Sequence, residues 1–113
     1  MITPILYWEG ASGETYGYGV HTLPFSHAPS MKGNYIFAKF INDSWHAVYI
    51  GEGNIDERIN DRIHYKCAIS KGATHVHVHT KSNEADRVQE VNDLLKHHHE
   101  THEPTGCNVK HLG

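Results

Sequence analysis

The first half of the chain consists of short runs in which hydrophobic and polar residues alternate. Two β-prone segments, residues 5–8 and 16–23, flank a glycine-containing turn, so we expect a hairpin-like N-terminal extension. Two further β-rich segments, residues 34–40 and 45–50, are separated by a short polar turn. This spacing predicts an antiparallel pair of strands at the centre of a sheet.

The second half begins with a change from alternation to helical spacing. Apolar side chains recur at every fourth position, at Ile55, Ile59, Ile63 and Cys67. Asn54 or Asp56 can cap the N-terminus of such a helix, and Gly72 can end it. We therefore expect one helix between Asn54 and Gly72.

Residues 73–80 return to strict alternation, which is typical of a half-buried strand. One face of this strand carries three histidines, His75, His77 and His79, and the other carries Thr74, Val76 and Val78. A second helix is expected to begin near residue 83. Its inward stripe is Val88, Val91, Leu94 and Leu95.

This order of elements predicts an α+β fold class, a small central antiparallel β-sheet flanked by helices with an N-terminal β-hairpin-like extension. At 113 residues the chain has the length of one ordinary domain. We assign residues 1–32 to the β-rich extension, packed on the same domain, and residues 33–113 to the domain itself.

Composition narrows the class of protein. Hydrophobic residues make up 38% of the chain, and no apolar run is long enough to span a membrane. Residues 1–7 have neither a basic segment nor a long apolar one, which favours a cytoplasmic location. Cys67 and Cys107 are the only cysteines, a number more typical of reduced thiols than of a disulfide framework. We therefore expect no disulfide.

The net charge argues against a protein that coats nucleic acid through bulk electrostatics. It is −3 with the 12 histidines neutral, whereas such proteins are usually basic. A local basic cleft is compatible with this charge. Because histidine titrates near pH 6.5, binding to a polyanion should strengthen as the pH falls.

Four short motifs follow one another along the expected strands and helices. They are Gly-Asn-Tyr ending at Tyr35, Tyr-Ile-Gly beginning at Tyr49, Ile-x-x-Arg ending at Arg58 and Pro-x-x-x-Asn ending at Asn108. Tyr-Ile-Gly alone is an ordinary end of a strand. In this order, however, the motifs resemble the GIY-YIG nuclease family over roughly residues 33–108.

The resemblance implies a metal-dependent endonuclease that hydrolyses phosphodiester bonds in DNA. Tyr35 and Tyr49 would be the tyrosine pair that positions or deprotonates water, and Arg58 would neutralise charge on the phosphate. Asn108 would brace the site by hydrogen bonds. His64 could supply a further proton-transfer or phosphate contact. An alternative for Arg58 is membership of a solvated charge network.

The resemblance also implies a glutamate that holds Mg²⁺ or Mn²⁺. At the matching position this chain has Val91, so the expected metal ligand is its neighbour Glu90, with Glu84 as the substitute. Both acids could equally be ordinary residues of an amphipathic helix. Glu52, which follows the second tyrosine motif, would repel a phosphate unless it paired with Arg58 or Lys66.

Two other functions are compatible with the sequence. One is a catalytically degenerate GIY-YIG-like module that binds nucleic acid or a small anion. The other is a histidine-based metal-binding protein, in which His75, His77 and His79 share a transition metal. The alternative for these three histidines is that they lie on a solvent-exposed strand face without binding metal. A second histidine group, His97, His98, His99 and His102, could bind metal adventitiously.

The oligomeric state is left open by the sequence. The N-terminal extension carries Tyr7, Trp8, Tyr16 and Tyr18 on β-prone segments. An open edge of this extension could pair with a second chain as an edge-strand dimer, or the extension could cover its own sheet.

Overall fold

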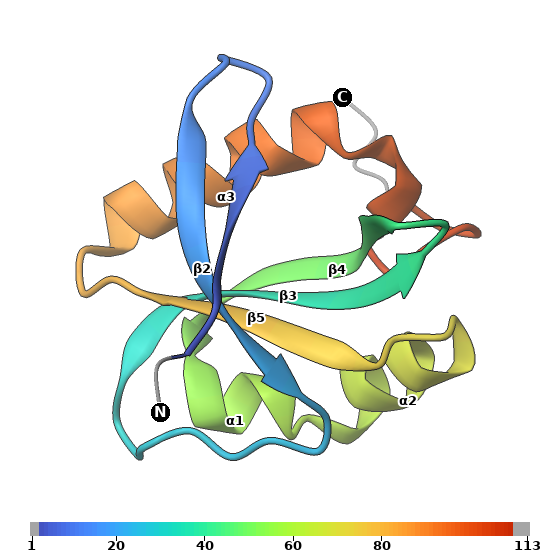
Figure 1. Cartoon of the computed structure of the whole chain (residues 1–113). Helices are drawn as coiled ribbons and strands as arrows, with labels where there is room; N and C mark the ends of the chain where they lie inside the picture. The colour runs from blue at the N-terminus through green and yellow to red at the C-terminus, as the bar shows by residue number, and fades with distance from the viewer. Residues whose placement is uncertain (1–2, 110–113) are drawn as a thin grey trace.

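The computed structural model describes residues 3–109 and contains one five-stranded antiparallel sheet with helices on both faces (Figure 1). The strands lie side by side in the order β1 (Ile5–Glu9), β2 (Thr15–Thr22), β5 (His75–Thr80), β3 (Lys32–Ile41) and β4 (Ser44–Asn54). In Figure 1, α3 (Glu84–His97) crosses one face of the sheet, and α1 (Ile55–Ile59) and α2 (Arg62–Ser70) lie against the other. The predicted α+β class, a small central antiparallel sheet flanked by helices, is confirmed. Residues 110–113, the end of the expected domain, lie outside the described residues.

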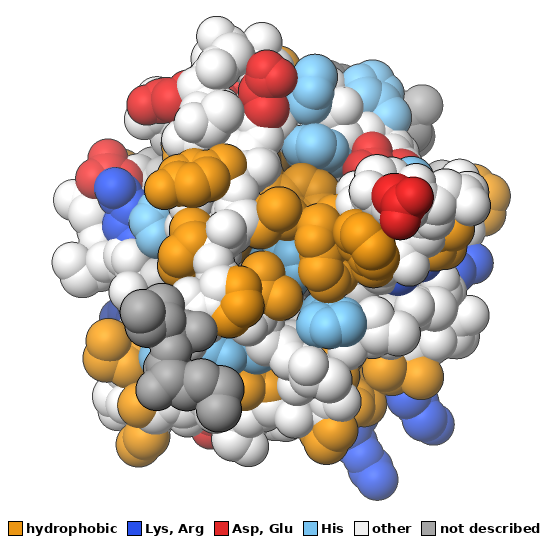
Figure 2. All heavy atoms as spheres, viewed as in Figure 1, with side chains coloured by type: hydrophobic (Ala, Val, Ile, Leu, Met, Phe, Trp, Pro, Cys, Tyr) orange, Lys and Arg blue, Asp and Glu red, His pale blue; other side chains and the backbone are white. Residues whose placement is uncertain are grey.

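The N-terminal hairpin forms as expected, but it is an integral part of the sheet. Its strands are β1 (Ile5–Glu9) and β2 (Thr15–Thr22), and β2 pairs with β5 (His75–Thr80) through Gly19 opposite Val78. The hairpin therefore extends the central sheet by two strands. Figure 2 shows hydrophobic side chains, with histidines among them, gathered at the centre of the face that carries this hairpin.

The central pair of strands is longer than the alternation predicts. β3 spans Lys32–Ile41 and β4 spans Ser44–Asn54. The turn between them places Asn42 and Asp43 at φ 53° and 62°. Asparagine and aspartate tolerate this left-handed conformation, and paired positive φ values suit a tight hairpin. Because β3 lies between β4 and β5, residues 33–38 of this strand are buried on both faces, whereas Phe40 and Ile41 at its end are exposed.

The expected single helix between Asn54 and Gly72 is wrong, because two short helices occupy this segment. They are α1 (Ile55–Ile59), capped by Asn54, and α2 (Arg62–Ser70). The Asp61 side chain accepts hydrogen bonds from the backbone N–H groups of Ile63 and His64, so it starts a new helix. Ile63 is consequently turned outward and is 77% exposed.

The second helix, α3, spans Glu84–His97 and is capped by Asn83 as expected. Three residues of its predicted inward stripe pack on the sheet, since Leu94 is buried and Val91 and Leu95 are partly buried against the same cluster. The prediction is wrong for Val88, which is 41% exposed, and the charged Arg87 and Glu90 also lie inward. Polar partners on the sheet and in the preceding loop account for this arrangement. No helix within residues 3–109 is long and apolar enough to cross a membrane.

Two hydrophobic clusters pack on opposite faces of the sheet. The cluster under α1 and α2 contains Tyr35, Phe37, Val48, Ile55, Ile59, Ala68, Ala73, Val76, Val78 and Cys107. The cluster under α3 contains Trp8, Tyr18, Ile36, Ala38, Ala47, Ile50 and Leu94. Every side chain of the central strands therefore belongs to one face or the other, and this assignment decides which candidate residues can meet.

The cysteines correct another expectation, because Cys67 and Cys107 form a disulfide. Cys67 lies on α2, and Cys107 follows the short 3-10 helix η1 (His99–Thr101) in the C-terminal segment. The backbone N–H of Cys107 donates to the carbonyl of Val48 on β4 at 2.9 Å. The C-terminal segment is thus held against the β4 edge and is linked covalently to α2. Sequence counting failed because it cannot show that two distant thiols meet.

Candidate functional site

The sheet register brings the two motif tyrosines together on the α1–α2 face. Tyr35 on β3 lies opposite Gly51 on β4, and Tyr49 lies opposite Phe37. The ring centroids of Tyr35 and Tyr49 are 5.9 Å apart. A Cβ atom at Gly51 would lie 2.5 Å from the Tyr35 hydroxyl, so the glycine makes room for the phenol. The glycine of the second motif therefore has a packing role beyond ending a strand.

Arg58 approaches this tyrosine pair from the end of α1. Its side chain crosses Gly53, where a Cβ atom would lie 2.9 Å from Arg58 Nε. Gly53 has φ +132°, a conformation that favours glycine. The positive charge of Arg58 acts to lower the pKa of both Tyr35 and Tyr49, which places the guanidinium within electrostatic reach of the pair. Arg58 itself is exposed.

His64 completes the group from the first turn of α2. Its ring stacks on Tyr49 with centroids 4.6 Å apart and planes at 23°. Its Nδ1 atom lies 3.9 Å from Asp61 Oδ1. We refer to Tyr35, Tyr49, Arg58 and His64 as the tyrosine–arginine cluster.

Asp61 is a neighbour of this cluster that the sequence did not single out. Its carboxylate caps α2 and acts to raise the pKa of both tyrosines. The signal that could have revealed it is the Asn60-Asp61 pair, since both residue types favour helix starts over helix interiors. A ligand at Arg58 has to compete with this charge.

Both tyrosines of the cluster are protonated at neutral pH. Burial is the largest cause that raises the pKa of Tyr35, and the adjacent Tyr49 raises it further. Burial likewise raises the pKa of Tyr49, which is partly exposed. The two hydroxyls are therefore hydrogen-bond donors rather than bases. Tyr35 is only 1% exposed, so Tyr49 is the member of the pair that an anionic oxygen or a water molecule can reach.

Asn108 lies beside the cluster at the edge of β4. Its Oδ1 accepts from the Ile50 N–H at 2.9 Å, and its Nδ2 donates to the Ile50 carbonyl at 3.0 Å. The side chain is 9% exposed. Asn108 thus closes the edge of the strand that carries Tyr49. Both polar atoms of its amide bond the backbone of Ile50, so Asn108 influences the cluster only through the position of β4.

The expected metal acids are not brought to the cluster. Glu90 Oε2 accepts from the Tyr18 hydroxyl and contacts His79 Nδ1 at 2.9 Å, which places it on the α3 face of the sheet. Glu84 begins α3 and is exposed. The sheet itself lies between these acids and Tyr35, so neither fits a metal that also serves the tyrosine–arginine cluster.

Glu52, which could have repelled a phosphate, also turns away from the cluster. Its Oε1 lies 3.3 Å from Arg87 Nε, and Arg87 also donates to the carbonyls of Lys81 and Ser82. This buried guanidinium belongs to the α3 face. The side chain of Glu52 is therefore paired away from Arg58.

The histidines of β5 are separated by their own partners. The Nδ1 atom of His77 accepts from Trp8 Nε1 at 3.0 Å, His79 contacts Glu90, and His75 contacts Thr74 Oγ1 at 2.7 Å. His77 is fully buried, whereas His75 and His79 are partly exposed, so solvent reaches the strand face only at these two residues. Among residues 3–109, no three His, Cys, Asp or Glu side chains are grouped so that they could hold a metal ion.

The α1–α2 face carries charges of both signs, because α1 holds Asp56 and Glu57 beside Arg58. α2 contains Arg62 and Lys66, both exposed, and no acid. These two residues, with Tyr65 and Asn60, line a cavity of about 270 Å³ near Pro24. Basic side chains therefore continue along the surface beyond Arg58.

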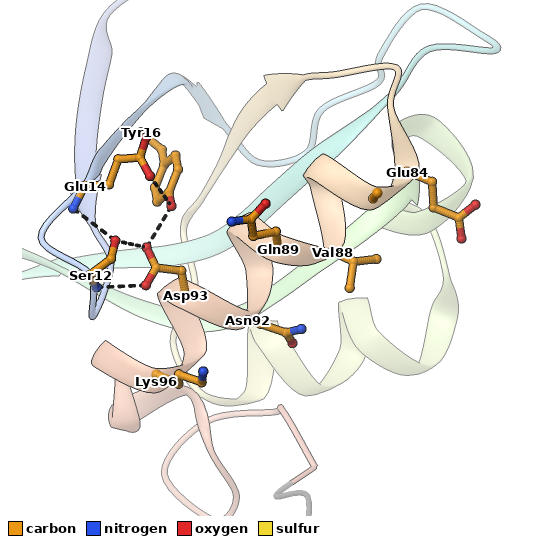
Figure 3. A pocket seen from close by; sticks show the side chains of 10 residues that line it. Ser12, Glu14, Tyr16, Glu84, Val88, Gln89, Asn92, Asp93 and Lys96 are labelled. Carbon is orange, nitrogen blue, oxygen red and sulfur yellow. Dashed lines mark hydrogen bonds between the residues drawn. The ribbon is translucent and has the colours of Figure 1, made fainter.

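A second cavity lies on the α3 side and has a different character (Figure 3). It measures about 820 Å³ and runs between the β1–β2 turn and α3. Its central carboxylate, Asp93, accepts from the backbone N–H and hydroxyl of Ser12 at 2.9 and 2.7 Å and from the Tyr16 hydroxyl at 2.7 Å. These bonds fasten the hairpin to α3, so Asp93 has a structural role.

Comparisons with protein-family models, with curated proteins and with solved structures found no match to this chain. The resemblance to the GIY-YIG nucleases therefore stays a prediction that depends on the motifs themselves. What can be argued about function has to come from the geometry of the tyrosine–arginine cluster.

Proposed function

We propose that this protein binds the phosphodiester backbone of nucleic acid through the tyrosine–arginine cluster, as a GIY-YIG-like module without a glutamate-held metal at that site. One observation carries the proposal: Tyr35, Tyr49 and His64 pack together on one face of the sheet with Arg58 beside them over Gly53, whereas Glu90 is engaged by Tyr18 and His79 on the other.

The chemistry of the cluster favours a phosphate oxygen as its ligand. An exposed guanidinium offers several N–H donors in a planar arrangement that matches phosphate. The protonated hydroxyl of Tyr49 and the imidazole of His64 stand beside it. A phosphodiester carries one negative charge and has oxygen atoms that accept hydrogen bonds from these donors. At neutral pH it has no acidic proton left, so binding it requires no base.

The surroundings favour an extended ligand over a single ion. Arg62 and Lys66 continue the positive charge along α2, so successive phosphates of one strand could contact Arg58 and then α2. The overall charge of −3 keeps non-specific attraction to nucleic acid weak.

The test is a binding titration with a fluorescently labelled oligodeoxynucleotide in the presence of a chelator. Arg58→Ala should weaken binding and should reduce the slope of log K against log salt by roughly 0.7 to 0.9, the value for one lost phosphate contact. Lys96→Ala removes an exposed cation from α3 and is the matched control, with binding unchanged. Equal loss in both variants, or none in either, would contradict the proposal.

The metal-dependent nuclease predicted from the motifs is the second candidate. The order of Tyr35, Tyr49 and Arg58 and their convergence support it, and DNA would then be the substrate. It requires a carboxylate other than Glu90 or Glu84 near the cluster, and Asp61 is a candidate because its Oδ1 lies 3.9 Å from Nδ1 of His64. Cleavage of supercoiled DNA with Mg²⁺ or Mn²⁺ that is abolished by Tyr49→Phe and by Asp61→Asn would favour the nuclease over the binding module.

A further inference from the structure

The Cys67–Cys107 disulfide joins the two segments that flank Tyr49. One is α2, in which His64 precedes Cys67 by one helical turn and stacks on Tyr49 at 4.6 Å. The other is the C-terminal segment, in which Asn108 directly follows Cys107 and bonds both backbone groups of Ile50. The bridge therefore sets the spacing between the histidine that covers Tyr49 and the strand edge that carries it.

We infer that this disulfide is a redox switch for the tyrosine–arginine cluster, so that its reduction weakens phosphodiester binding. The inference rests on the proposed function, because it assigns a means of control to the same site. With the bridge intact, α2 and β4 are held at one separation. Without it, hydrogen bonds and the packing of Cys107 retain the C-terminal segment on β4, and α2 loses its covalent anchor.

The two sulfur atoms differ in their access to a reductant. Cys107 is 5% exposed and belongs to the hydrophobic cluster under α1 and α2. Cys67 is partly exposed on α2. A thiolate from solution can therefore attack Cys67 Sγ more readily than the sulfur of Cys107.

The exchange balances with a dithiol as the reductant. Attack of one thiolate on Cys67 Sγ forms a mixed disulfide and releases Cys107 as a thiolate, which takes up a proton. The second thiol of the reductant then attacks the reductant sulfur that is bonded to Cys67 Sγ. This closes the reductant into a cyclic disulfide and releases Cys67 as a thiol. The protein gains two electrons and two protons, and the dithiol loses the same number.

Remaining contacts keep the C-terminal segment near its place after reduction. The N–H of Cys107 still donates to Val48, and the N–H of Asn108 donates to the Thr101 carbonyl at 2.8 Å. A Cβ atom at Gly106 would lie 2.4 Å from that same carbonyl, so the turn packs closely. Reduction should therefore loosen the link between α2 and β4 without releasing the whole segment, which suits a graded change in affinity.

The experiment compares oligodeoxynucleotide binding by the oxidised protein, by the protein reduced with dithiothreitol, and by Cys67→Ala/Cys107→Ala. Titrations are made at a temperature at which far-UV circular dichroism shows each form to be folded. We expect affinity to fall roughly 5-fold or more in the reduced and double-variant forms, the lower range of ordinary coupling between sites. Reoxidation should restore binding in the wild type alone.

Leu94→Ala is the control for a general loss of stability. Leu94 lies on α3 and is fully buried against the face of the sheet opposite the tyrosine–arginine cluster. Its truncation leaves the disulfide intact. This variant should bind as the oxidised wild type does. Equal weakening of Leu94→Ala and the reduced protein would overturn the switch, because stability alone would then explain the effect.

The outcomes separate this inference from the proposed function. Binding by the oxidised protein that is unchanged on reduction overturns the switch and leaves the binding module standing. Absence of binding by the oxidised protein overturns both. Binding that depends on Arg58, is lost on reduction and is kept in Leu94→Ala supports both.

Discussion

Removing the Cys67–Cys107 disulfide should cost this protein a large part of its stability. The two cysteines are 40 residues apart in the sequence. In the chain-entropy model, closing a loop of that length removes roughly 13 cal/mol/K from the unfolded chain, or about 4 kcal/mol at 25 °C. For 113 residues, an unfolding entropy of about 2.1 cal/mol/K per residue converts this loss into a decrease in Tm of roughly 16 °C.

The assay is thermal unfolding of the oxidised protein and of Cys67→Ala/Cys107→Ala, followed by circular dichroism. Urea titration supplies the free energy of unfolding independently. Mass spectrometry of peptides under non-reducing conditions verifies the bridge. A decrease in Tm of only a few degrees, with the bridge verified in the wild type, would refute the reasoning that the link between α2 and the C-terminal segment constrains the unfolded chain.

Three further predictions concern the buried polar residues. Burial lowers the pKa of His77 to about 3, below the usual 6.5, so between these two values the unfolded state binds more protons than the folded state. The free energy of unfolding should therefore fall as the pH falls from about 6.5 towards 3, by up to about 1.4 kcal/mol per pH unit. Urea unfolding of His77→Gln should show a weaker pH dependence than the wild type, and an unchanged dependence would count against this explanation. Glu90→Ala leaves Tyr18 and His79 without their partner and should destabilise the protein by roughly 3 kcal/mol without changing oligonucleotide affinity; a variant that lost binding while keeping its stability would contradict the placement of Glu90. Asn108→Ala strips both Ile50 backbone groups of their partner and should cost roughly 2 kcal/mol in urea titration, a loss that Asn108→Asp should only partly repair, because a carboxylate accepts but does not donate.

The strands were predictable because their signal is local. Alternation with a period of two residues identifies a strand wherever one face differs from the other, and residues 73–80 show this clearly. The joining of the hairpin to β5 was not predictable in the same way. That pairing connects Gly19 with Val78, and no local pattern records a contact over such a separation.

The helices show where a periodic pattern misleads. The isoleucines at four-residue spacing continue through Asn60 and Asp61, so periodicity predicted one helix. Asp61 ends that continuity, because its side chain satisfies the N–H groups of a new first turn. A local hydrogen bond thus outweighed the apolar pattern, and Ile63 became exposed.

The residues of the candidate site also differ in how far the sequence could predict their placement. The motif order placed Tyr35, Tyr49, Arg58 and His64 near one another, since they stand on adjacent strands and the helices that follow them. The face on which Glu90 lies was beyond the sequence, because its partner Tyr18 is 72 residues away. The disulfide was missed for the same reason. Local periodicity indicates which residues share an element, but not which elements share a face.

The most direct test of the central claim is an NMR titration of ¹⁵N-labelled, oxidised protein with an oligodeoxynucleotide in the presence of a chelator. The account predicts that chemical-shift changes concentrate on β4 around Tyr49, on α1 at Arg58 and on α2 from His64 onward. Changes confined to α3 and the hairpin around Glu90, with β4 and α2 unaffected, would contradict it.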